Sequence, residues 1–426
     1  MDKIVANKKS KPLSLFLIIL LLVVFLSSCA KISDTDTADT GSADEGDDEN
    51  DPCGNALGNG NEIISGPSGP SGADYDSVFR SLTVDPTNPG IVIIGTERNG
   101  FVKSTDGGVN WTRLRYGLRH DDIGYPEIYD IGISASNTDV LYAAAIDSNG
   151  PVTGDYPSSK AGLYKSIDGG QTWYRKNCGI DNSSIPVVHV DPVDPDIAII
   201  GIRGGYPSFT ELSDQYFDGG IYKSTNGGES WERITVEAND RYNDYLIIRM
   251  ANADPNKLIT FGFNYDDLNL NLGFLKSTDN GSSWIQFAPD LKGLLISYFD
   301  ISSDASVIYA VSRDEWKILK SADGGNTWIE FPFHMSCYAL AVSPSDAKRV
   351  LFSIMYKLYL TTDGMQSYTM VIDNIGSTFD DIVFASSNNN IVYAVTKGYL
   401  LYKSEDGGVT FSLVKNIRSD VLNVIP

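Results

Sequence analysis

Histidine is scarce in this chain. Only 3 histidines occur among its 426 residues. His120, His189 and His334 are far apart and lack the spacing of metal ligands, which excludes a histidine-rich metal site. The sequence also has no glycine-rich segment that follows a strand and opens a helix to hold phosphates. We therefore expect no bound metal and no other cofactor.

Basic residues are in the minority. The chain has 33 Lys and Arg against 55 Asp and Glu, a formal net charge of −22. A protein this acidic repels phosphate backbones at long range, so nucleic acid is excluded as a partner and strongly anionic glycans are disfavoured.

Long apolar runs are absent apart from one near the N-terminus. Residues 13–26 are almost all apolar and follow four lysines, which is the pattern of an export signal. A transmembrane anchor is the alternative, although the run is short for one. The run ends in Leu26-Ser27-Ser28-Cys29, which resembles the bacterial lipobox. The resemblance implies that the signal peptide 1–28 is removed and that lipid on Cys29 anchors a lipoprotein in the cell envelope. Ala30 stands where an aspartate would favour the inner membrane, which implies the outer membrane or cell surface.

Residues 29–74 have a composition typical of a disordered tether. Eleven acidic residues and one lysine follow Cys29, large apolar side chains are almost missing, and the segment ends in Gly-Pro-Ser repeats. Such a segment cannot bury enough apolar surface to fold, and its charges extend it. We therefore expect a flexible acidic linker.

One octapeptide recurs seven times along the rest of the chain, at spacings of 40 to 62 residues. Five of the six tryptophans occupy its last position. The copies are STDGGVNW from Ser104, SIDGGQTW from Ser166, STNGGESW from Ser224, STDNGSSW from Ser277, SADGGNTW from Ser321, TTDGMQSY from Thr361 and SEDGGVTF from Ser404.

Each octapeptide position has a predicted structural role. The acidic or amide side chain accepts backbone hydrogen bonds across a turn, the glycines adopt angles that other residues avoid, and the aromatic ring is buried between sheets. The residues expected in these roles are Asp106, Asp168, Asn226, Asp279, Asp323, Asp363, Asp406, Trp111, Trp173, Trp231, Trp284 and Trp328.

A second pattern recurs in phase with the first. Segments such as SLTVDPTNPGIVIIGT read as strand, Asp-Pro turn, strand, and segments such as GLYKS supply a third strand before each octapeptide. A fourth strand follows the aromatic residue. Tandem four-stranded antiparallel sheets close radially, so residues 75–426 are predicted to form an all-β, seven-bladed β-propeller. Residues 419–426 resemble the start of another first strand and could join the first blade or pack as a tail.

The octapeptides resemble the Asp-box, or BNR repeat, of sialidase-like propellers. The resemblance covers about residues 75–415, and the sixth copy is the weakest because Met365 replaces a glycine. Seven copies fit the xyloglucanase-like, sortilin-like and photosystem II assembly-factor-like branches better than six-bladed sialidases. The Thr96-Glu97 context before Gly100 is also similar to the xyloglucanase-like branch.

Cysteines offer no disulfide framework. Cys29 is expected to carry lipid and Cys53 lies in the tether, while Cys178 and Cys337 lie in distant repeats. We therefore expect no disulfides, even in an oxidising compartment.

Long insertions gather on one predicted face. Because strands alternate in direction, the Asp-Pro and octapeptide turns share one face, and the other connections share the opposite face. The insertions 113–129, 147–160, 203–218, 233–244 and 264–270 all belong to that opposite face. Loops on a rigid scaffold commonly carry recognition. The candidate binding residues are Arg80, Tyr125, Tyr206, Tyr242, Tyr245 and Tyr265, with the alternative that the tyrosines pin the loops to one another.

Catalysis is the competing hypothesis. Glu97 has the place of a catalytic carboxylate in xyloglucanase-like enzymes, but their second carboxylate comes from a second propeller. A glycoside hydrolase here would need a loop acid such as Asp155 or Asp240. Arg80 stands roughly where sialidases have the first arginine of a triad, but the rest of that motif is missing, so sialidase activity is not expected.

The sequence therefore favours a monomeric, lipid-anchored propeller that binds a glycan or an envelope protein without catalysis. A xyloglucanase-like glycoside hydrolase and an assembly factor for an envelope protein are the alternatives.

Overall fold

The structure is a computed structural model that describes residues 79–119, 125–146, 160–180, 183–204, 218–236, 240, 243–264, 271–373 and 376–417. For Phe79 and Arg80 it describes the backbone alone. The predicted signal peptide and tether, with Cys29 and Cys53, lie outside these residues, as does the segment 419–426. Among the described residues, no helix has the length and apolar character needed to cross a membrane.

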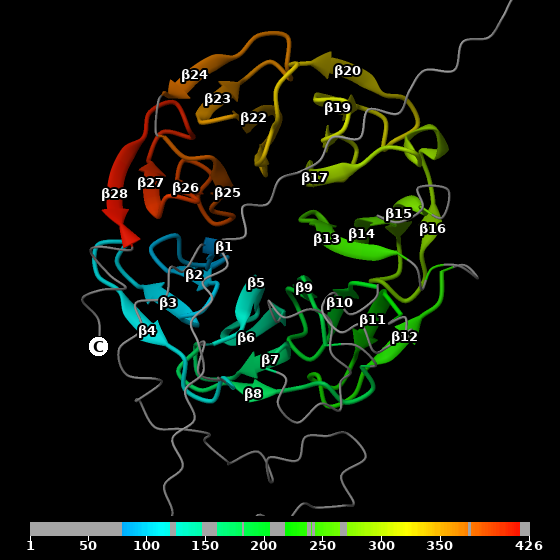
Figure 1. Cartoon of the computed structure of the whole chain (residues 1–426), viewed down its shortest axis with the longest axis vertical. Helices are drawn as coiled ribbons and strands as arrows, with labels where there is room; N and C mark the ends of the chain where they lie inside the picture. The colour runs from blue at the N-terminus through cyan, green and yellow to red at the C-terminus, as the bar shows by residue number, and fades with distance from the viewer. Residues whose placement is uncertain are drawn as a thin grey trace, which may run out of the picture. The chain divides into compact units, whose positions relative to one another are not determined.

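The described residues form seven four-stranded antiparallel sheets in a ring (Figure 1). Within each sheet the strands follow one another in chain order, with the first strand next to the centre of the ring and the fourth at its rim. The prediction of a seven-bladed β-propeller is therefore confirmed.

The strands match the predicted repeat. Blades 1 and 2 contain β1 (Phe79–Val84), β2 (Val92–Thr96), β3 (Phe101–Ser104), β4 (Thr112–Leu114), β5 (Glu127–Ser134), β6 (Asn137–Ile146), β7 (Gly162–Ser166) and β8 (Tyr174–Arg175). Blades 3 and 4 contain β9 (Val187–Val190), β10 (Ala198–Ile202), β11 (Gly220–Ser224), β12 (Glu232–Ile234), β13 (Asp244–Ala251), β14 (Asp254–Phe263), β15 (Gly273–Ser277) and β16 (Ile285–Gln286), followed by the 3-10 helix η4 (Pro289–Leu291). Blades 5 to 7 contain β17 (Ile296–Ile301), β18 (Ile308–Ser312), β19 (Lys317–Ser321), β20 (Ile329–Pro332), β21 (Leu340–Ser343), β22 (Asp346–Ile354), β23 (Lys357–Thr361), β24 (Thr369–Ile372), β25 (Phe379–Phe384), β26 (Val392–Thr396), β27 (Leu400–Ser404) and β28 (Ser412–Asn416).

The second strand of a blade is its most buried one. All five residues of β2, β10, β18 and β26 are buried, and these strands are rich in Val, Ile and Ala. A strand covered on both faces reads as a continuous apolar run, because each neighbouring blade packs against one of its faces. These strands form the centres of the inter-blade cores.

The octapeptide turns are held by their own side chains. In the first turn, the Ser104 hydroxyl donates to Asp106 Oδ1 over 2.9 Å, and the N–H groups of Gly108 and Asn110 bond to Ser104 and Asp106 over 2.8 Å each. Gly107 and Gly108 have φ of 75° and 97°, the left-handed region that favours glycine. The sixth turn keeps this geometry although Met365 adopts φ 79° there, and its buried side chain packs in the core between blades 5 and 6.

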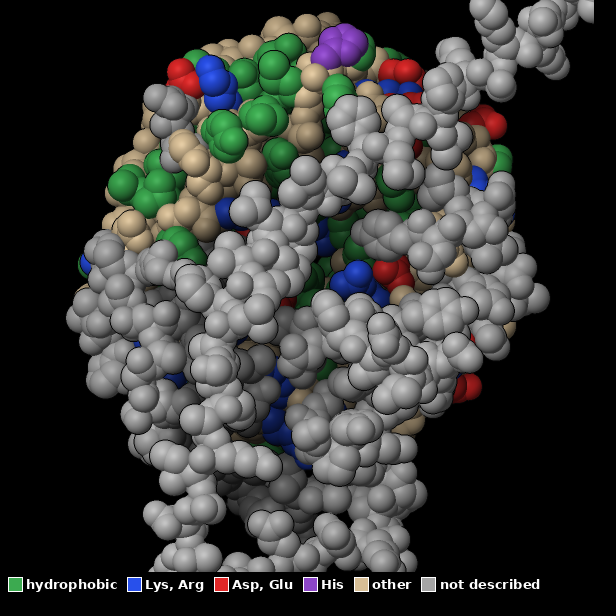
Figure 2. All heavy atoms as spheres, in the orientation of Figure 1, with side chains coloured by type: hydrophobic (Ala, Val, Ile, Leu, Met, Phe, Trp, Pro, Cys, Tyr) green, Lys and Arg blue, Asp and Glu red, His purple; other side chains and the backbone are tan. Residues whose placement is uncertain are grey.

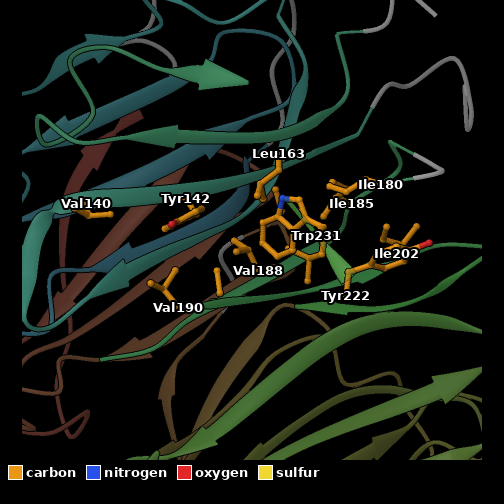
Figure 3. Packing of buried hydrophobic residues seen from close by; sticks show 13 residues of the cluster. Val140, Tyr142, Leu163, Ile180, Ile185, Val188, Val190, Ile202, Tyr222 and Trp231 are labelled. Atoms are coloured by element: carbon orange, nitrogen blue, oxygen red, sulfur yellow. The ribbon is translucent and has the colours of Figure 1, made fainter. Parts of the chain in front are cut away.

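The aromatic residue that ends an octapeptide packs between blades. Trp231 of blade 3 shares one buried cluster with Tyr142 and Leu163 of blade 2, and Figure 3 shows its ring beside Leu163 and Val188. Its indole N–H donates to the carbonyl of Lys176 in blade 2 over 2.9 Å. Full burial of so large a ring contributes several kcal/mol to the cohesion of adjacent sheets.

A lysine on the third strand links several blades to the next. Lys103, Lys165 and Lys223 each donate to a backbone carbonyl in the following octapeptide turn, at Gly169, Gly227 and Asn280 respectively, over 2.7 to 3.0 Å. Lys320 does the same to Gly364 over 2.8 Å. The glycine-rich turn thus serves as an acceptor for its neighbour as well as a turn.

Side-chain packing closes the ring between blades 7 and 1. Leu401 and Ile417 of blade 7 share a buried cluster with Val102, against which Trp111 packs. The Tyr393 hydroxyl donates to the carbonyl of Pro89 over 3.0 Å. Among the described residues, the sheet of blade 1 consists of β1 to β4 alone.

The prediction of no disulfides is wrong. Cys178, which follows β8, is disulfide-bonded. Cys337 is a buried free thiol, so the two repeat cysteines are not joined to each other. The sequence argument considered only a bond between Cys178 and Cys337, which lie in distant repeats.

Candidate functional site: the loop face and the central channel

Two tyrosines predicted to bind a ligand belong instead to the core. Tyr125 is 4% exposed, its N–H donates to the carbonyl of Arg98, and the Arg115 guanidinium lies 5.3 Å from its ring. Tyr245 is completely buried between blades 3 and 4. Tyr245 lies in the first strand β13, where alternate residues face the neighbouring blade, and Tyr125 lies two residues before β5. Both rings therefore pack in buried clusters between blades.

The remaining predicted binding residues are only partly covered by the structure. Tyr206, Tyr242 and Tyr265, and the candidate acid Asp155, lie outside the described residues. Arg80 lies in β1 at a register shift between Phe79 and Ser81, where a bulge interrupts the pairing with β2.

Glu97 and Asp240, the two described candidate carboxylates, differ in their surroundings. Glu97 follows β2 and is half-buried. Burial is the main cause that raises the pKa of the Tyr399 hydroxyl, and the negative charge of Glu97 raises it further. Tyr399 of blade 7 therefore lies near this carboxylate. Asp240 is 2% exposed, pairs with Arg233 over 2.7 Å, and accepts the N–H of Val236 over 2.8 Å. Asp240 therefore anchors its loop and is not available as a catalytic acid.

A group of exposed apolar side chains on blades 5 and 6 was not predicted. We call Trp316, Met335, Tyr338 and Tyr356 the aromatic arc; they are 51%, 55%, 37% and 45% exposed. All four belong to connections on the loop face, between the second and third strands or between successive blades. Figure 2 shows hydrophobic side chains gathered over this part of the ring, near β22 and β23.

Backbone hydrogen bonds make the aromatic arc continuous across two blades. In the segment between β20 and β21, the N–H of Phe333 donates to the carbonyl of Trp316 over 3.1 Å. The carbonyl of Ser336 in the same segment accepts from the N–H of Met355 over 3.0 Å. The Tyr338 N–H donates to the Ser353 hydroxyl over 3.2 Å. One segment thus joins the short turns that present Trp316 and Tyr356.

Backbone strain accompanies the aromatic arc. Trp316, His334 and Met355 have φ of 52°, 57° and 51°. Bulky residues rarely adopt this left-handed region, and such strain concentrates where a segment is shaped for recognition. The turns therefore keep a costly conformation that displays large side chains.

The central channel contains a cavity of about 260 Å³. Its wall comes from first strands, and its lining reaches Asn252, Pro344 and Ser386, which lie in the turns between first and second strands. The cavity therefore opens towards the face of the Asp-Pro turns, opposite the loop face.

Charged side chains from three blades meet in the wall of this cavity. Arg249 of β13 pairs with Asp300 of β17 over 3.3 Å, and donates to the Tyr298 hydroxyl over 3.0 Å. Tyr298 donates in turn to Asp381 of β25 over 3.1 Å. A fourth blade adds Asp130 of β5 to the same lining.

Bulges in the first strands aim these side chains. The pairing registers shift just before Asp130, Tyr298 and Asp381. A bulge bends a strand and redirects the side chains that follow it, which is a common device beside binding sites. Polar residues thereby reach the channel from strands that are otherwise apolar.

Burial governs the protonation of this cluster. It raises the pKa of Asp130 and Asp300, and raises the pKa of Asp381 to about 7. Burial opposes the charge on Arg249, but Tyr298 and Asp300 nearby raise the pKa of Arg249 above its ordinary value. The arginine is therefore charged throughout the physiological range, while Asp381 changes charge near neutral pH.

The propeller is similar in fold to solved structures from two functional classes. A GH74 xyloglucanase from Xanthomonas campestris matches with a TM-score of 0.62 and 15% identity, over 80% of this chain and 54% of that enzyme. A GH74 enzyme from Niastella koreensis matches with a TM-score of 0.57 and 16% identity, over 79% and 53%. YCF48, in a structure with a D1 peptide bound, matches with a TM-score of 0.53 and 12% identity, over 80% and 96%.

These similarities establish the fold and not the function. The chain spans about half the length of the xyloglucanases that it matches, and almost all of YCF48. No protein-family profile and no curated protein sequence matches the chain.

Proposed function

We propose that this protein is a non-catalytic binding protein, anchored at the outer membrane or cell surface by lipid on Cys29, whose loop face binds a polypeptide partner. The aromatic arc carries this proposal. Contiguous exposed apolar side chains commonly mark an interaction surface, and aromatic residues and methionine are enriched in protein interfaces. The arc has charged neighbours in Glu315, Glu330 and Lys357, as the rim of an interface requires.

A polypeptide suits the arc better than a glycan. Met335 is the most exposed of the four side chains, and a thioether offers a sugar almost no hydrogen bonding. Methionine adapts readily to the side chains of a protein partner. The match along nearly the whole of YCF48, whose structure holds a peptide, supports the same class of partner.

Glycoside hydrolysis has less support. Glu97 is half-buried and remains a candidate carboxylate, but Asp240 is already committed to Arg233 and Val236. The alignment with the xyloglucanases stops at about half of their length, and their activity belongs to the whole enzymes. Hydrolysis needs two carboxylates on opposite sides of the scissile bond.

Site-specific photocrosslinking in the producing cells tests the proposal. A benzoylphenylalanine replaces Trp316 in the full chain, and a second variant carries it at Ile329, which is 59% exposed on the outer strand of the same blade. The partner that crosslinks only from position 316 is then purified. We expect Trp316→Ala and Tyr356→Ala to weaken its binding at least tenfold, and Ile329→Ala to change it less than twofold.

Two results would overturn the proposal. Retention of neutral polysaccharides that Trp316→Ala abolishes would replace the polypeptide by a glycan. Release of reducing ends by the purified chain, abolished by Glu97→Gln, would make the protein a glycoside hydrolase.

A further inference from the structure

The channel cavity lies on the other side of the ring from the aromatic arc. Asn252, Pro344 and Ser386 line its mouth, and all three belong to turns between first and second strands. The loop-face proposal uses none of the residues that line the cavity. Whatever occupies the cavity therefore approaches from the turn face and is a separate ligand.

The charges around the cavity do not balance. Its lining contains three acidic residues, Asp130, Asp300 and Asp381, and one basic residue, Arg249. The guanidinium is already committed: Nη1 donates to the carbonyl of Ile248, Nη2 to Tyr298, and Nε faces Asp300. Arg249 therefore neutralises one carboxylate, and three of its five N–H groups already have partners.

The carboxylates differ in how far their oxygens are used. Asp130 accepts one backbone N–H at each oxygen, from Ile131 and Val188. Asp381 accepts two hydrogen bonds at Oδ1, from Tyr298 and Ile382, and no described residue donates to its Oδ2. Each carboxylate oxygen can accept two bonds, so Asp130 and Asp381 both keep capacity for two more, which at Asp381 lies wholly at Oδ2.

We propose that this cavity binds a small organic cation, with an ammonium or guanidinium head held by Asp381 and Asp130. Apolar residues, among them Met250 and Ile301, also line the cavity and can contact an alkyl stem. A volume of about 260 Å³ is smaller than that of a drug-sized site and matches a head group with a short chain.

An organic cation fits the cluster better than a metal ion. Within the described residues, no three His, Cys, Asp or Glu side chains are close enough together to hold a metal. A calcium or magnesium ion needs several oxygens at 2.0 to 2.6 Å. An ammonium group needs fewer and longer contacts, which carboxylates from different blades supply.

Calorimetry on the full chain tests the site with named probes. Agmatine and n-butylammonium are titrated in turn. Calcium is the control for a metal cation, and n-butyrate is the control for an anion with a similar alkyl chain. We expect millimolar or tighter binding of both amines and none of butyrate. Asp381→Asn should weaken amine binding at least tenfold, while Asp373→Asn, an exposed acid paired with Lys357, should change it less than twofold.

The pH dependence adds a second readout. Asp381 faces Tyr298, Arg249, Asp130 and Asp300, and its pKa of about 7 means that the carboxylate gains its charge between pH 6 and pH 8. We expect about tenfold tighter amine binding at pH 8 than at pH 6 in the original protein, and no such change in Asp381→Asn. Thermal unfolding shows whether each variant is folded, and Asp130→Asn serves if Asp381→Asn is not.

The probes also distinguish the source of the cation. A capped lysine that binds more tightly than n-butylammonium indicates a side chain of a protein partner, whereas a preference for agmatine indicates a free amine. Absence of amine binding, calcium binding in place of amines, or unchanged affinity in Asp381→Asn would each overturn the proposal. Because no loop-face residue is involved, these results leave the aromatic arc untouched.

Discussion

Blades 2 to 4 and blades 5 to 7 use the same repeat differently. In blades 2 to 4 the aromatic residue of the octapeptide is 2% to 6% exposed, at Trp173, Trp231 and Trp284. In blades 5 to 7 Trp328 and Phe411 are half-buried, and Tyr368 is 48% exposed. The difference shows that one motif either seals an inter-blade core or stabilises a turn with its ring partly open.

Connecting segments explain part of this contrast. The backbone N–H of Trp173 donates to the carbonyl of Tyr116, and the backbone N–H of Trp231 donates to the carbonyl of Cys178. Each tryptophan is therefore covered by the segment that follows the outer strand of the preceding blade. Blades 5 and 6 have shorter connections, and their turns carry the exposed side chains of the aromatic arc. Long connections in one half seal the core, and short ones in the other half present apolar surface.

The largest expected effect is on stability. Trp231→Ala should lower the free energy of unfolding by about 3–5 kcal/mol, because it leaves a cavity between blades 2 and 3. Tyr368→Ala should cost less than about 1 kcal/mol, because its ring is already half in water. Urea unfolding followed by tryptophan and far-UV signals measures both. Equal losses would mean that the two halves do not differ in this way.

A smaller effect is expected from the lysines that join blades. Lys165 donates to the carbonyl of Gly227 and pairs with Asp196, whereas Lys403 of blade 7 pairs with Glu405, which is 73% exposed. Lys165→Met should cost about 1.5–3 kcal/mol, because it removes a charged donor from a buried carbonyl. Lys403→Met should cost less than about 0.5 kcal/mol, because exposed pairs contribute little. Thermal melts of the two variants beside the original protein give the comparison, and a larger loss in Lys403→Met would contradict it.

The fold could be predicted from the sequence because the motifs that indicate it are local and repeated. A turn motif with its glycines, a strand pattern and a buried aromatic occur in phase, and each is read within a few residues. Met365 shows the limit, since its turn forms without the expected second glycine.

The candidate site was less predictable because it depends on register and orientation. Tyr125 and Tyr245 are loop-adjacent in sequence yet point into the core. Arg249 and Asp381 reach the channel through pairing across strands and bulges that no local pattern encodes. Two signals were nevertheless present. Charged residues interrupt apolar first strands at these positions, and Trp316 is the one tryptophan outside the octapeptides.

The smallest expected effect concerns acid stability and uses blade 3 as the reference. Hydrogen bonds from Thr327 and Ser367 lower the pKa of Asp323 and Asp363 from 3.8 to about 2, while blade 3 has Asn226, which does not titrate. A carboxyl with a lowered folded pKa stabilises the protein above pH 3.8, and this stabilisation is lost as the pH falls towards 2. Asn226 accepts from Ser224 and Ser230 in the same way, so asparagine fits the turn. The double variant Asp323→Asn, Asp363→Asn should therefore lose less melting temperature between pH 4 and pH 2 than the original protein. An unchanged slope would place the acid sensitivity elsewhere in the ring.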